Sequence, residues 1–238
     1  MGKALRELYD VVIVGAGPAG AAATLRATKQ KATALVIDHA AAPQDEQSVG
    51  WLGPAGIALC KECGVSAKKI GAGEFKGLHL HSWDLRRNIQ ASEAGLRGWL
   101  VDRATFDAAL LNQATKAGAH ALRGIEPQAL DLTEDRVVLH LADGREVAGR
   151  LMLIAEGAAS PTARMANLIT AAQMRDAPQC LFAEYETKQK ETRLDVAVGA
   201  NRAGQVASIV HLGRTVSLAI TTRAADVPVE QQFSAFRA

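Results

Sequence analysis

The sequence is poor in the features that mark several classes of protein. Aromatic residues make up 4% of its 238 residues, too few for the stacking platforms that bind single-stranded nucleic acid. Acidic and basic residues nearly balance, giving a formal net charge of +2, so no basic surface for nucleic acid is predicted. No apolar run reaches about 18 residues, the length of a membrane-spanning helix. We therefore expect neither nucleic-acid binding nor a transmembrane segment.

Cysteines and several catalytic motifs are also scarce or missing. Three cysteines cannot all pair within the chain, which fits a reducing compartment, so we expect a cytoplasmic protein. The first eight residues lack the apolar core of a signal peptide. No Gly-x-Ser-x-Gly, His-Glu-x-x-His or Gly-x-x-x-x-Gly-Lys-Ser/Thr motif occurs, so nothing in the sequence favours a hydrolase.

A glycine-rich segment near the N-terminus is the strongest positive signal. The apolar run Tyr9–Val14 has the length of a buried parallel strand, and an alanine-rich stretch with helical character begins at Pro18. A second apolar run, 34–37, ends in Asp38. Strand, glycine turn, helix and second strand with a terminal acid make up the pattern of a dinucleotide-binding βαβ unit. The predicted contacts in the turn are Gly15, Ala16, Gly17, Pro18, Ala19 and Gly20.

Each glycine of the turn has a physical reason in this pattern. Gly15 permits the tight turn, Gly17 lets backbone N–H groups approach a pyrophosphate, and Gly20 lets the helix pack closely on the strand. The phosphates would lie at the helix N-terminus, where unpaired N–H groups and the helix dipole favour negative charge. Asp38 is placed to accept hydrogen bonds from the adenosine ribose.

The remaining pattern predicts a two-part α/β chain. The expected helices cover 18–30, 54–63, 102–117 and the segment after Pro228. The expected strands cover 33–37, 77–83, 96–101, 119–123, 136–141, 145–148, 150–155, 180–187, 194–200, 205–212 and 215–221, with a loop over 40–53. We therefore predict a Rossmann-like FAD/NAD(P)-binding domain with a parallel sheet over 1–178, within which 50–100 is of uncertain assignment. An incomplete antiparallel-sheet substrate domain is predicted over 179–238.

Three motifs together resemble one family of flavoproteins. They are the glycine turn, the helix start Asp102-Arg103-Ala-Thr-Phe-Asp107-Ala-Ala-Leu110 and the segment Ala155-Glu156-Gly157-Ala-Ala-Ser160. In order and spacing they are similar, over about 9–165, to FAD-dependent oxidoreductases of the p-hydroxybenzoate hydroxylase and geranylgeranyl reductase group. The resemblance implies FAD as cofactor, with NAD(P)H a candidate reductant.

The same resemblance implies further cofactor contacts. Arg103 matches an arginine beside the phosphate or ribityl part of the flavin, where its fork of donors suits an oxyanion. Glu156 and Gly157 stand where the group usually has Asp-Gly. Ser48 and Gly50 fall where its reductase branch places a glycine-rich loop against the isoalloxazine ring. Asp38 replaces the commoner Glu.

One motif of the group has no counterpart. Its members carry a Gly-Asp pair before a late helix, and no Gly-Asp dipeptide occurs in this sequence. The last residues, 231–238, resemble the helix that precedes that motif. We expect either that a missing C-terminal segment or a partner chain completes the flavin site, or that the cofactor is held incompletely.

The function expected is that of an FAD-dependent oxidoreductase, a monooxygenase or a reductase, acting on a small or lipid-like organic substrate. A non-catalytic dinucleotide-binding or partner protein and an NAD(P)-dependent dehydrogenase are the alternatives. Cys60-x-x-Cys63 and His79-x-His81 could supply zinc ligands, but the cysteines lie on a predicted helix face and the histidines lack zinc-finger spacing, so we expect no metal site. No histidine is singled out by its setting, so no catalytic acid or base is predicted.

Overall fold

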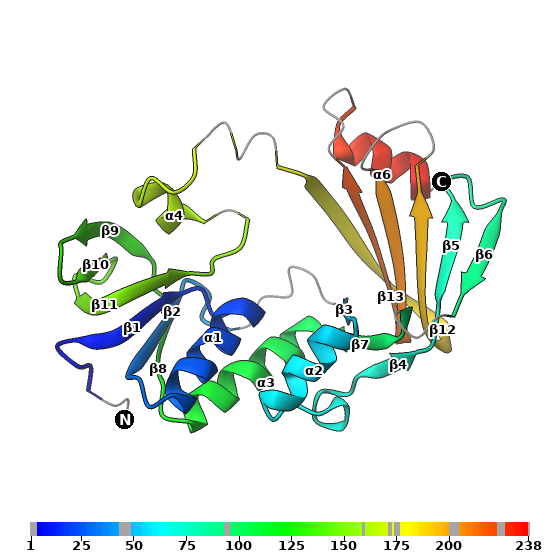
Figure 1. Cartoon of the computed structure of the whole chain (residues 1–238). Coiled ribbons are helices and arrows are strands. Elements are labelled where there is room, and N and C mark those ends of the chain that lie inside the picture. Colours follow the sequence, from blue (N-terminus) through cyan, green and yellow to red (C-terminus); the bar gives the residue numbers. More distant parts are fainter. Residues whose placement is uncertain are drawn as a thin grey trace. The chain divides into compact units, whose positions relative to one another are not determined.

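The computed structural model describes residues 4–42, 49–92, 96–158, 160–170, 173, 177–199, 205–222 and 227–237. The chain divides into two compact units, and each is assembled from separate stretches of sequence (Figure 1). Unit 1 comprises Met1–Gln44, Cys63–Val65 and Ala104–Arg175. Unit 2 comprises Asp45–Glu62, Ser66–Arg103 and Asp176–Ala238, so it takes up most of the segment 50–100.

Unit 1 is built on a six-stranded sheet with the order β8-β2-β1-β11-β10-β9. Strands β8, β2, β1 and β11 are parallel to one another, and β9, β10 and β11 form an antiparallel meander. Its elements are β1 (Tyr9–Val14), α1 (Pro18–Lys29), β2 (Ala34–Asp38), α3 (Arg103–Lys116), β8 (His120–Arg123), β9 (Pro127–Leu132), β10 (Val137–Leu141), β11 (Glu146–Ile154) and α4 (Pro161–Met165). The predicted βαβ start and parallel sheet are confirmed.

One core of unit 1 lies between the parallel strands and the meander. It joins side chains of β1 and β2 to those of β10 and β11, and its most buried large members are Tyr9, Val12, Leu35, Ile37 and Leu139. Strand β2 and the second half of β1 are buried, as expected for parallel strands covered on both faces.

The structure corrects the prediction of two separate strands over 145–148 and 150–155. A single strand, β11, runs through both, because Gly149 is the residue at which its neighbours change. Gly149 pairs with Val137 of β10 on one side and with Tyr9 of β1 on the other. A Cβ at Gly149 would lie 2.8 Å from Cγ2 of Val12, so the glycine permits close packing there and is not a break.

Unit 2 contains a four-stranded sheet, β13-β12-β5-β6, and a small sheet, β3-β7-β4. Strand β5 pairs in parallel with β12, whereas β12 and β13 pair antiparallel. Its elements are β3 (Val49–Leu52), α2 (Pro54–Glu62), the 3-10 helix η1 (Ala67–Ile70), β4 (Gly73–Phe75), β5 (Leu78–Ser82), β6 (Asn88–Ala91), β7 (Gly98–Asp102), β12 (Gln179–Val198), β13 (Val206–Thr222) and α6 (Val229–Arg237).

The four antiparallel strands predicted over 180–221 are two long strands. β12 and β13 pair over two stretches, and their register shifts between Glu186 and Glu191. Gly213 stands opposite this shift with φ +63. The breaks predicted at 188–193 and 213–214 are therefore bends within continuous strands, whereas the break after 200 does separate β12 from β13; both ribbons bend sharply (Figure 1).

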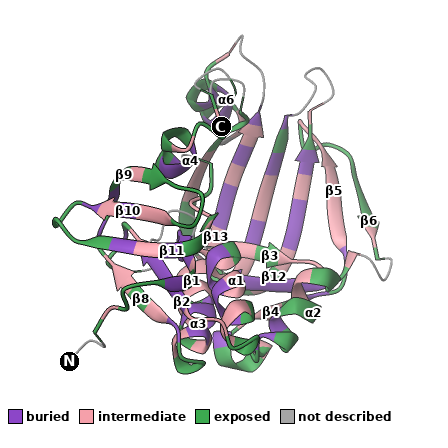
Figure 2. Ribbon diagram, turned by 60° about the vertical axis from the view of Figure 1, so that its left-hand side comes forward, coloured by how far each residue is buried: buried purple, intermediate pink, exposed green. Residues whose placement is uncertain are grey.

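Both faces of the β5–β12–β13 sheet carry buried side chains. On one face, Leu194 and Val210 pack with Phe75 and Leu100 of the small sheet. On the other, α6 contributes Phe233, in a cluster with Ala197, Ala207, Leu218 and Ile220. The buried residues of β12 lie in its last part, from Leu194 to Ala197, whereas those of β13 recur along the strand (Figure 2). Among the described residues, no helix combines the length and the apolar character needed to cross a membrane.

Candidate cofactor site

The glycine turn between β1 and α1 has the geometry that a dinucleotide-binding loop needs. Gly15 has φ +104, and a Cβ there would lie 2.4 Å from the carbonyl oxygen of Ala155. A Cβ at Gly20 would lie 1.8 Å from the carbonyl oxygen of Gly15. Both positions therefore require glycine for the fold itself.

Gly17 differs from Gly15 and Gly20 because no atom of another part of the chain lies within 4 Å of the position that its Cβ would take. Its φ of −63° and ψ of −176° are open to any residue, and no side chain caps the helix that begins at Pro18. The fold alone therefore gives no reason for a glycine at 17. A ligand that approaches the helix N-terminus closely would give one.

Asp38, at the end of β2, closes the turn from the other side. Its Oδ2 accepts a hydrogen bond from the backbone N–H of Ala16 at 2.5 Å, and its Oδ1 accepts one from Ala40 at 2.8 Å. A carboxylate offers about four lone-pair directions, so each oxygen retains capacity for another donor. Asp38 thus fixes the loop, and the predicted ribose contact remains compatible with these bonds.

The end of β11 meets the glycine turn within unit 1. The N–H of Ala155 donates to the carbonyl of Val14 at 2.7 Å, and the backbone N of Glu156 would lie 2.8 Å from a Cβ at Gly15. Two of the motifs singled out in the sequence, more than 130 residues apart, are thus brought together. Gly157 has φ +80 and open space where a Cβ would be.

Glu156 itself acts as the cap of the short helix α4. Its Oε2 accepts hydrogen bonds from the N–H of Thr162 at 2.9 Å and from Oγ of Ser160 at 3.0 Å. Its Oε1 accepts one from Oγ1 of Thr162 at 2.9 Å. Thr162 is fully buried, so this carboxylate satisfies buried donors. The predicted cofactor contact of Glu156 stays a prediction beside this structural role.

Unit 2 brings together two other predicted contacts, Gly50 on β3 and Arg103 at the start of α3. A Cβ at Gly50 would lie 2.8 Å from Cδ of Arg103, so the glycine makes room for the arginine side chain to cross the strand. The pair was predicted from separate parts of the family pattern, and the structure places them in contact. Ser48, the third predicted contact of this group, lies outside the described residues.

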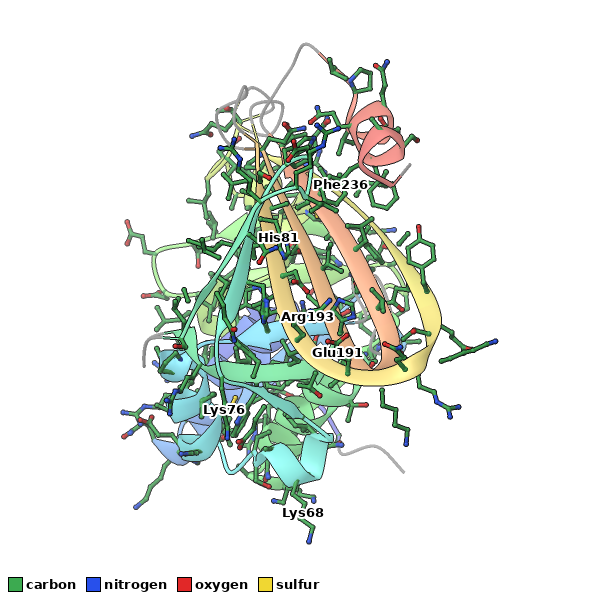
Figure 3. The ribbon with its side chains drawn as sticks, turned by 90° about the vertical axis from the view of Figure 1, so that its right-hand side faces the viewer. Lys68, Lys76, His81, Glu191, Arg193 and Phe236 are labelled. Atoms are coloured by element: carbon green, nitrogen blue, oxygen red, sulfur yellow. The ribbon has the colours of Figure 1, made fainter. Side chains whose placement is uncertain are left out.

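A network of charged side chains on the β5–β12–β13 sheet was not predicted. Asp195 is 3% exposed, and its carboxylate lies 2.7 Å from Nε2 of His81 and 2.6 Å from Nε of Arg193 (Figure 3). Nη1 of Arg193 lies 2.5 Å from Oε1 of Glu191, and Nε2 of His211 lies 3.4 Å from Oδ2 of Asp195. The sequence signal that could have revealed this network is the alternation Glu191-x-Arg193-x-Asp195, which puts three charges on one face of a strand.

The network holds Asp195 in its ionised form. Burial by itself would raise the pKa of this carboxyl, but hydrogen bonds from His211, Arg193 and His81 outweigh it. The net effect is a pKa well below the ordinary value of an aspartate. Nδ1 of His81 is buried and has no hydrogen-bond partner among the described residues.

Three of the four residues weighed as zinc ligands have other places in the fold. Cys60 and Cys63 are buried, at 3% and 7% exposure, and His81 binds Asp195. Within the residues that the structure describes, no group of three or more His, Cys, Asp or Glu side chains could hold a metal ion.

Sequence comparison relates the chain to named reductases. No protein-family model matches it. It is 33% identical over 166 residues to menaquinone reductase of Mycobacterium tuberculosis, a match that covers 65% of this chain and 39% of that protein. It is 28% identical over 186 residues to digeranylgeranylglycerophospholipid reductase of Methanosarcina mazei, covering 74% and 44%. The chain thus spans less than half the length of these curated relatives.

Solved structures share the fold over nearly the whole chain. A geranylgeranyl bacteriochlorophyll reductase-like protein from Thermoplasma acidophilum matches with a TM-score of 0.77 and 22% identity, covering 97% of this chain and 60% of that one. A variant of the halogenase PltM, solved in complex with FAD, matches with a TM-score of 0.76 and 15% identity, covering 98% and 56%. At these identities the likeness establishes the fold. The chain is thus similar in sequence to part of these named reductases, and it shares its fold with a geranylgeranyl bacteriochlorophyll reductase-like protein and with a halogenase solved in complex with FAD.

Proposed function

We propose that this chain is the FAD-binding and substrate-binding part of an oxidoreductase, of the reductase or monooxygenase type. Two groups of residues would bind the cofactor. The glycine turn and Asp38 of unit 1 would bind the adenosine diphosphate half. Gly50 and Arg103 of unit 2 would contact the flavin half, with Ser48 beside them.

The observation that carries this proposal is the contrast between the three glycines of the turn. Gly15 and Gly20 are each required by a backbone contact under 3 Å, whereas Gly17 has open space beside it. That space adjoins the uncapped N-terminus of α1, a position with unpaired N–H groups and a favourable dipole for phosphate. The residues present therefore fit a pyrophosphate.

Bound FAD would supply the hydride or oxygen chemistry, and the protein's part is to bind, orient and shield it. Asp38 fixes Ala16 and Ala40 so that the loop is preorganised. Arg103 brings a permanent positive charge for a phosphate or ribityl oxygen. No residue is assigned as a catalytic acid or base.

The substrate we propose is a small or lipid-like organic molecule that binds at the sheet to which 179–238 contributes β12 and β13, the segment predicted from sequence as a substrate domain. The relatives named above support a lipid-like substrate, since they are called menaquinone and digeranylgeranylglycerophospholipid reductases. NAD(P)H is the reductant we propose, and the cytoplasm the location. We further propose that polypeptide equivalent to the part of the relatives that the match does not cover, in the same chain or a partner chain, completes the flavin site.

Titration of the purified chain with FAD, ADP and NADH tests the proposal. We expect FAD to bind, with flavin absorbance near 450 nm retained after gel filtration, and ADP to compete with it. A chain that binds neither FAD nor ADP would refute the proposal. Binding of NADH in preference to FAD would favour an NAD(P)-dependent dehydrogenase instead. FAD that binds but is never reduced by NAD(P)H would favour a non-catalytic dinucleotide-binding protein.

A further inference from the structure

The charged network of unit 2 contains two histidines that share one carboxylate, and the proposed flavin site uses neither of them. Oδ1 of Asp195 lies 2.7 Å from Nε2 of His81, and Oδ2 of Asp195 lies 3.4 Å from Nε2 of His211. Histidine is the only side chain whose ordinary charge change falls between about pH 5 and 8. A proton taken up by either ring would therefore act on the network near neutral pH.

His81 is placed to be a neutral donor. The carboxyl of Asp195 is ionised and can only accept, so Nε2 of His81 carries the hydrogen of their bond. Nδ1 of the same ring is buried and has no hydrogen-bond partner among the described residues. In the neutral ring this atom is a lone pair, whereas a proton there would be a buried donor without an acceptor, which costs its full desolvation. The geometry therefore opposes protonation of His81.

His211 has a carboxylate at each end of its ring. Nδ1 lies 3.5 Å from Oε2 of Glu191, and Nε2 lies 3.4 Å from Oδ2 of Asp195. Nη2 of Arg193 lies 3.2 Å from the same Nε2, and a guanidinium can only donate. Nε2 is therefore the acceptor of this bond, and the hydrogen of the neutral ring sits on Nδ1, facing Glu191. Two acceptors are thus in place for a second proton on this ring.

Arg193 occupies the same two carboxylates as His211. Its Nε lies 2.6 Å from Oδ2 of Asp195, and its Nη1 lies 2.5 Å from Oε1 of Glu191. Arg193 and His211 stand opposite each other in the register of β12 and β13. While His211 is neutral, two carboxylates face one cation, so a proton on His211 would balance the charge. Nε2 of His211 and Nη2 of Arg193 would then both be donors, and they could not stay 3.2 Å apart.

His79 is the other titratable group that β5 places on this face. It stands beside Asp195 in the parallel register of β5 and β12, so its side chain lies on the same face of the sheet. Within the described residues, the ion pairs of His81 and His211 are all made with side chains of β12. The charges that decide the protonation of these two rings are therefore those of β12 described above.

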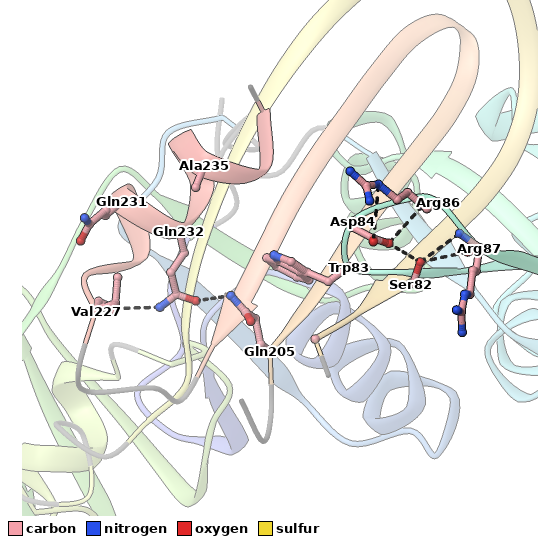
Figure 4. A pocket seen from close by; sticks show the side chains of 11 residues that line it. Ser82, Trp83, Asp84, Arg86, Arg87, Gln205, Val227, Gln231, Gln232 and Ala235 are labelled. Carbon is pink, nitrogen blue, oxygen red and sulfur yellow. Dashed lines mark hydrogen bonds and ion pairs between the residues drawn. The ribbon is translucent and has the colours of Figure 1, made fainter. Parts of the chain in front are cut away.

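Helix α6 covers the other end of this face, next to Ala197, and is tied to the residue before β13 by neutral amides. Nε2 of Gln205 donates to Oε1 of Gln232 at 2.6 Å (Figure 4). In the neighbouring β5–β6 turn, Oδ2 of Asp84 lies 3.8 Å from Nε of Arg86. Amides do not titrate, and this acid and base keep their charges where histidines change theirs. These groups therefore give no competing proton exchange.

We propose that His211 is a pH-sensitive latch between β12 and β13. While the ring is neutral, Arg193 donates to Nε2 of His211 and bridges the two carboxylates. When the ring takes up a proton from solvent, it donates to Asp195 and Glu191, and the guanidinium of Arg193, whose side chain is 36% exposed, turns toward water. Glu191 stands at the register shift opposite Gly213, so the exchange changes the contacts beside the bend of the two strands. The proposal does not rest on the flavin.

NMR of the whole chain, labelled with 15N in histidine and arginine, tests the proposal over about pH 5 to 8. At the upper end we expect the Nδ1–H tautomer of His211 and the Nε2–H tautomer of His81. As the pH falls, His211 should become doubly protonated before His81, and the Nε–H resonance of Arg193 should shift with the same midpoint as the His211 ring. The Nε2–H tautomer of His211, earlier protonation of His81, or an Arg193 resonance that does not follow His211 would overturn the proposal. All these signals come from the unmodified protein.

Two variants sharpen the test. His211→Gln retains a hydrogen-bonding side chain but takes up no proton, so the Arg193 resonance should lose its pH dependence. His140→Gln is the matched control, because His140 of unit 1 also lies between two carboxylates, 2.7 Å from Asp131 and 3.1 Å from Glu146. The hydrogen bond to Asp131 raises the pKa of His140, so this ring takes up a proton in the same experiment. An Arg193 resonance that still titrates in His211→Gln, or stops titrating in His140→Gln, would overturn the proposal.

Discussion

Replacement of Gly17 by alanine should separate cofactor binding from folding. The new Cβ meets no atom within 4 Å, and alanine adopts φ −63° and ψ −176° without strain. Alanine is a poorer helix N-cap than glycine by about 0.5–1 kcal/mol, but it lowers the entropy of the unfolded chain by a similar amount. The free energy of unfolding should therefore change by less than about 1 kcal/mol, or a shift of under about 4 °C in Tm for a chain of this size.

Affinity for FAD should fall much further than stability. A methyl group at Gly17 keeps the pyrophosphate from the N–H groups of the turn, and each charge-assisted hydrogen bond lost costs about 1.5–3 kcal/mol. A loss of about 10- to 100-fold in affinity follows. The assay is equilibrium dialysis with FAD and with ADP, alongside thermal unfolding without ligand.

Gly20→Ala is the matched control for this experiment. Its Cβ would lie 1.8 Å from the carbonyl oxygen of Gly15, so the helix must move away from the strand. A loss of about 3 kcal/mol or more in stability is expected, with weak binding only as a consequence of poor folding. A Gly17→Ala variant that keeps its affinity for FAD within twofold would refute the assignment of this loop to the pyrophosphate.

Three further changes probe other parts of the molecule. The pKa of Asp195 is lower in the folded chain than the value of about 3.9 expected in the unfolded chain, so the unfolded chain binds more protons in this range and the free energy of unfolding should fall as the pH drops below about 4. The Asp195→Asn variant, measured by urea unfolding from pH 3 to 7, should lose this part of the pH dependence. An unchanged pH profile would contradict the network. Glu156→Ala should cost about 1–3 kcal/mol because Thr162 and Ser160 lose their acceptor, while exposed Glu134→Ala should cost almost nothing, and equal effects would argue against the cap. Leu194 is 1% exposed, so Leu194→Ala should lower the free energy of unfolding by about 2–5 kcal/mol in thermal or urea unfolding, whereas Leu132→Ala, at a residue 61% exposed, should lower it by less than about 1 kcal/mol. A small loss at Leu194 would contradict the packing of β12 and β13 on the small sheet.

The elements that could be predicted from sequence are those with strong local signals. Helix α1 begins at Pro18 as predicted, because a glycine, a proline and an alanine-rich run act together at its start. The hairpin of β10 and β11 follows the Asp143-Gly144 signal, and α6 follows Pro228. The glycine turn could be predicted because its glycine spacing is itself a local signal, although the contact that requires glycine at position 15 is with Ala155, far along the chain.

The elements that were missed depend on partners far away in the sequence. Strand β3 lies within a predicted loop, since its Gly50 and the exposed Trp51 give no alternation, and it exists because β7 pairs with it. Strand β6 is largely exposed and polar, and only β5 gives it a place in a sheet. Contact between Gly50 and Arg103 could be suspected only from the family resemblance, and the Asp195 network only from charge alternation on one strand.

The interleaving of the two units has a consequence for the order in which the chain can fold as it is made. Strand β5 is synthesised early, yet its parallel partner is β12, and His81 must wait for Asp195, 114 residues later. At about 5–20 residues per second, the β5–β6 hairpin waits roughly 6–23 s before the paired segment of β12 has been synthesised. Because each unit is assembled from separate stretches of sequence, neither unit can complete its fold until its last stretch has been synthesised. A nascent chain of this protein therefore carries an unpaired strand edge through about half of its synthesis, which is the kind of edge that favours pairing with other chains.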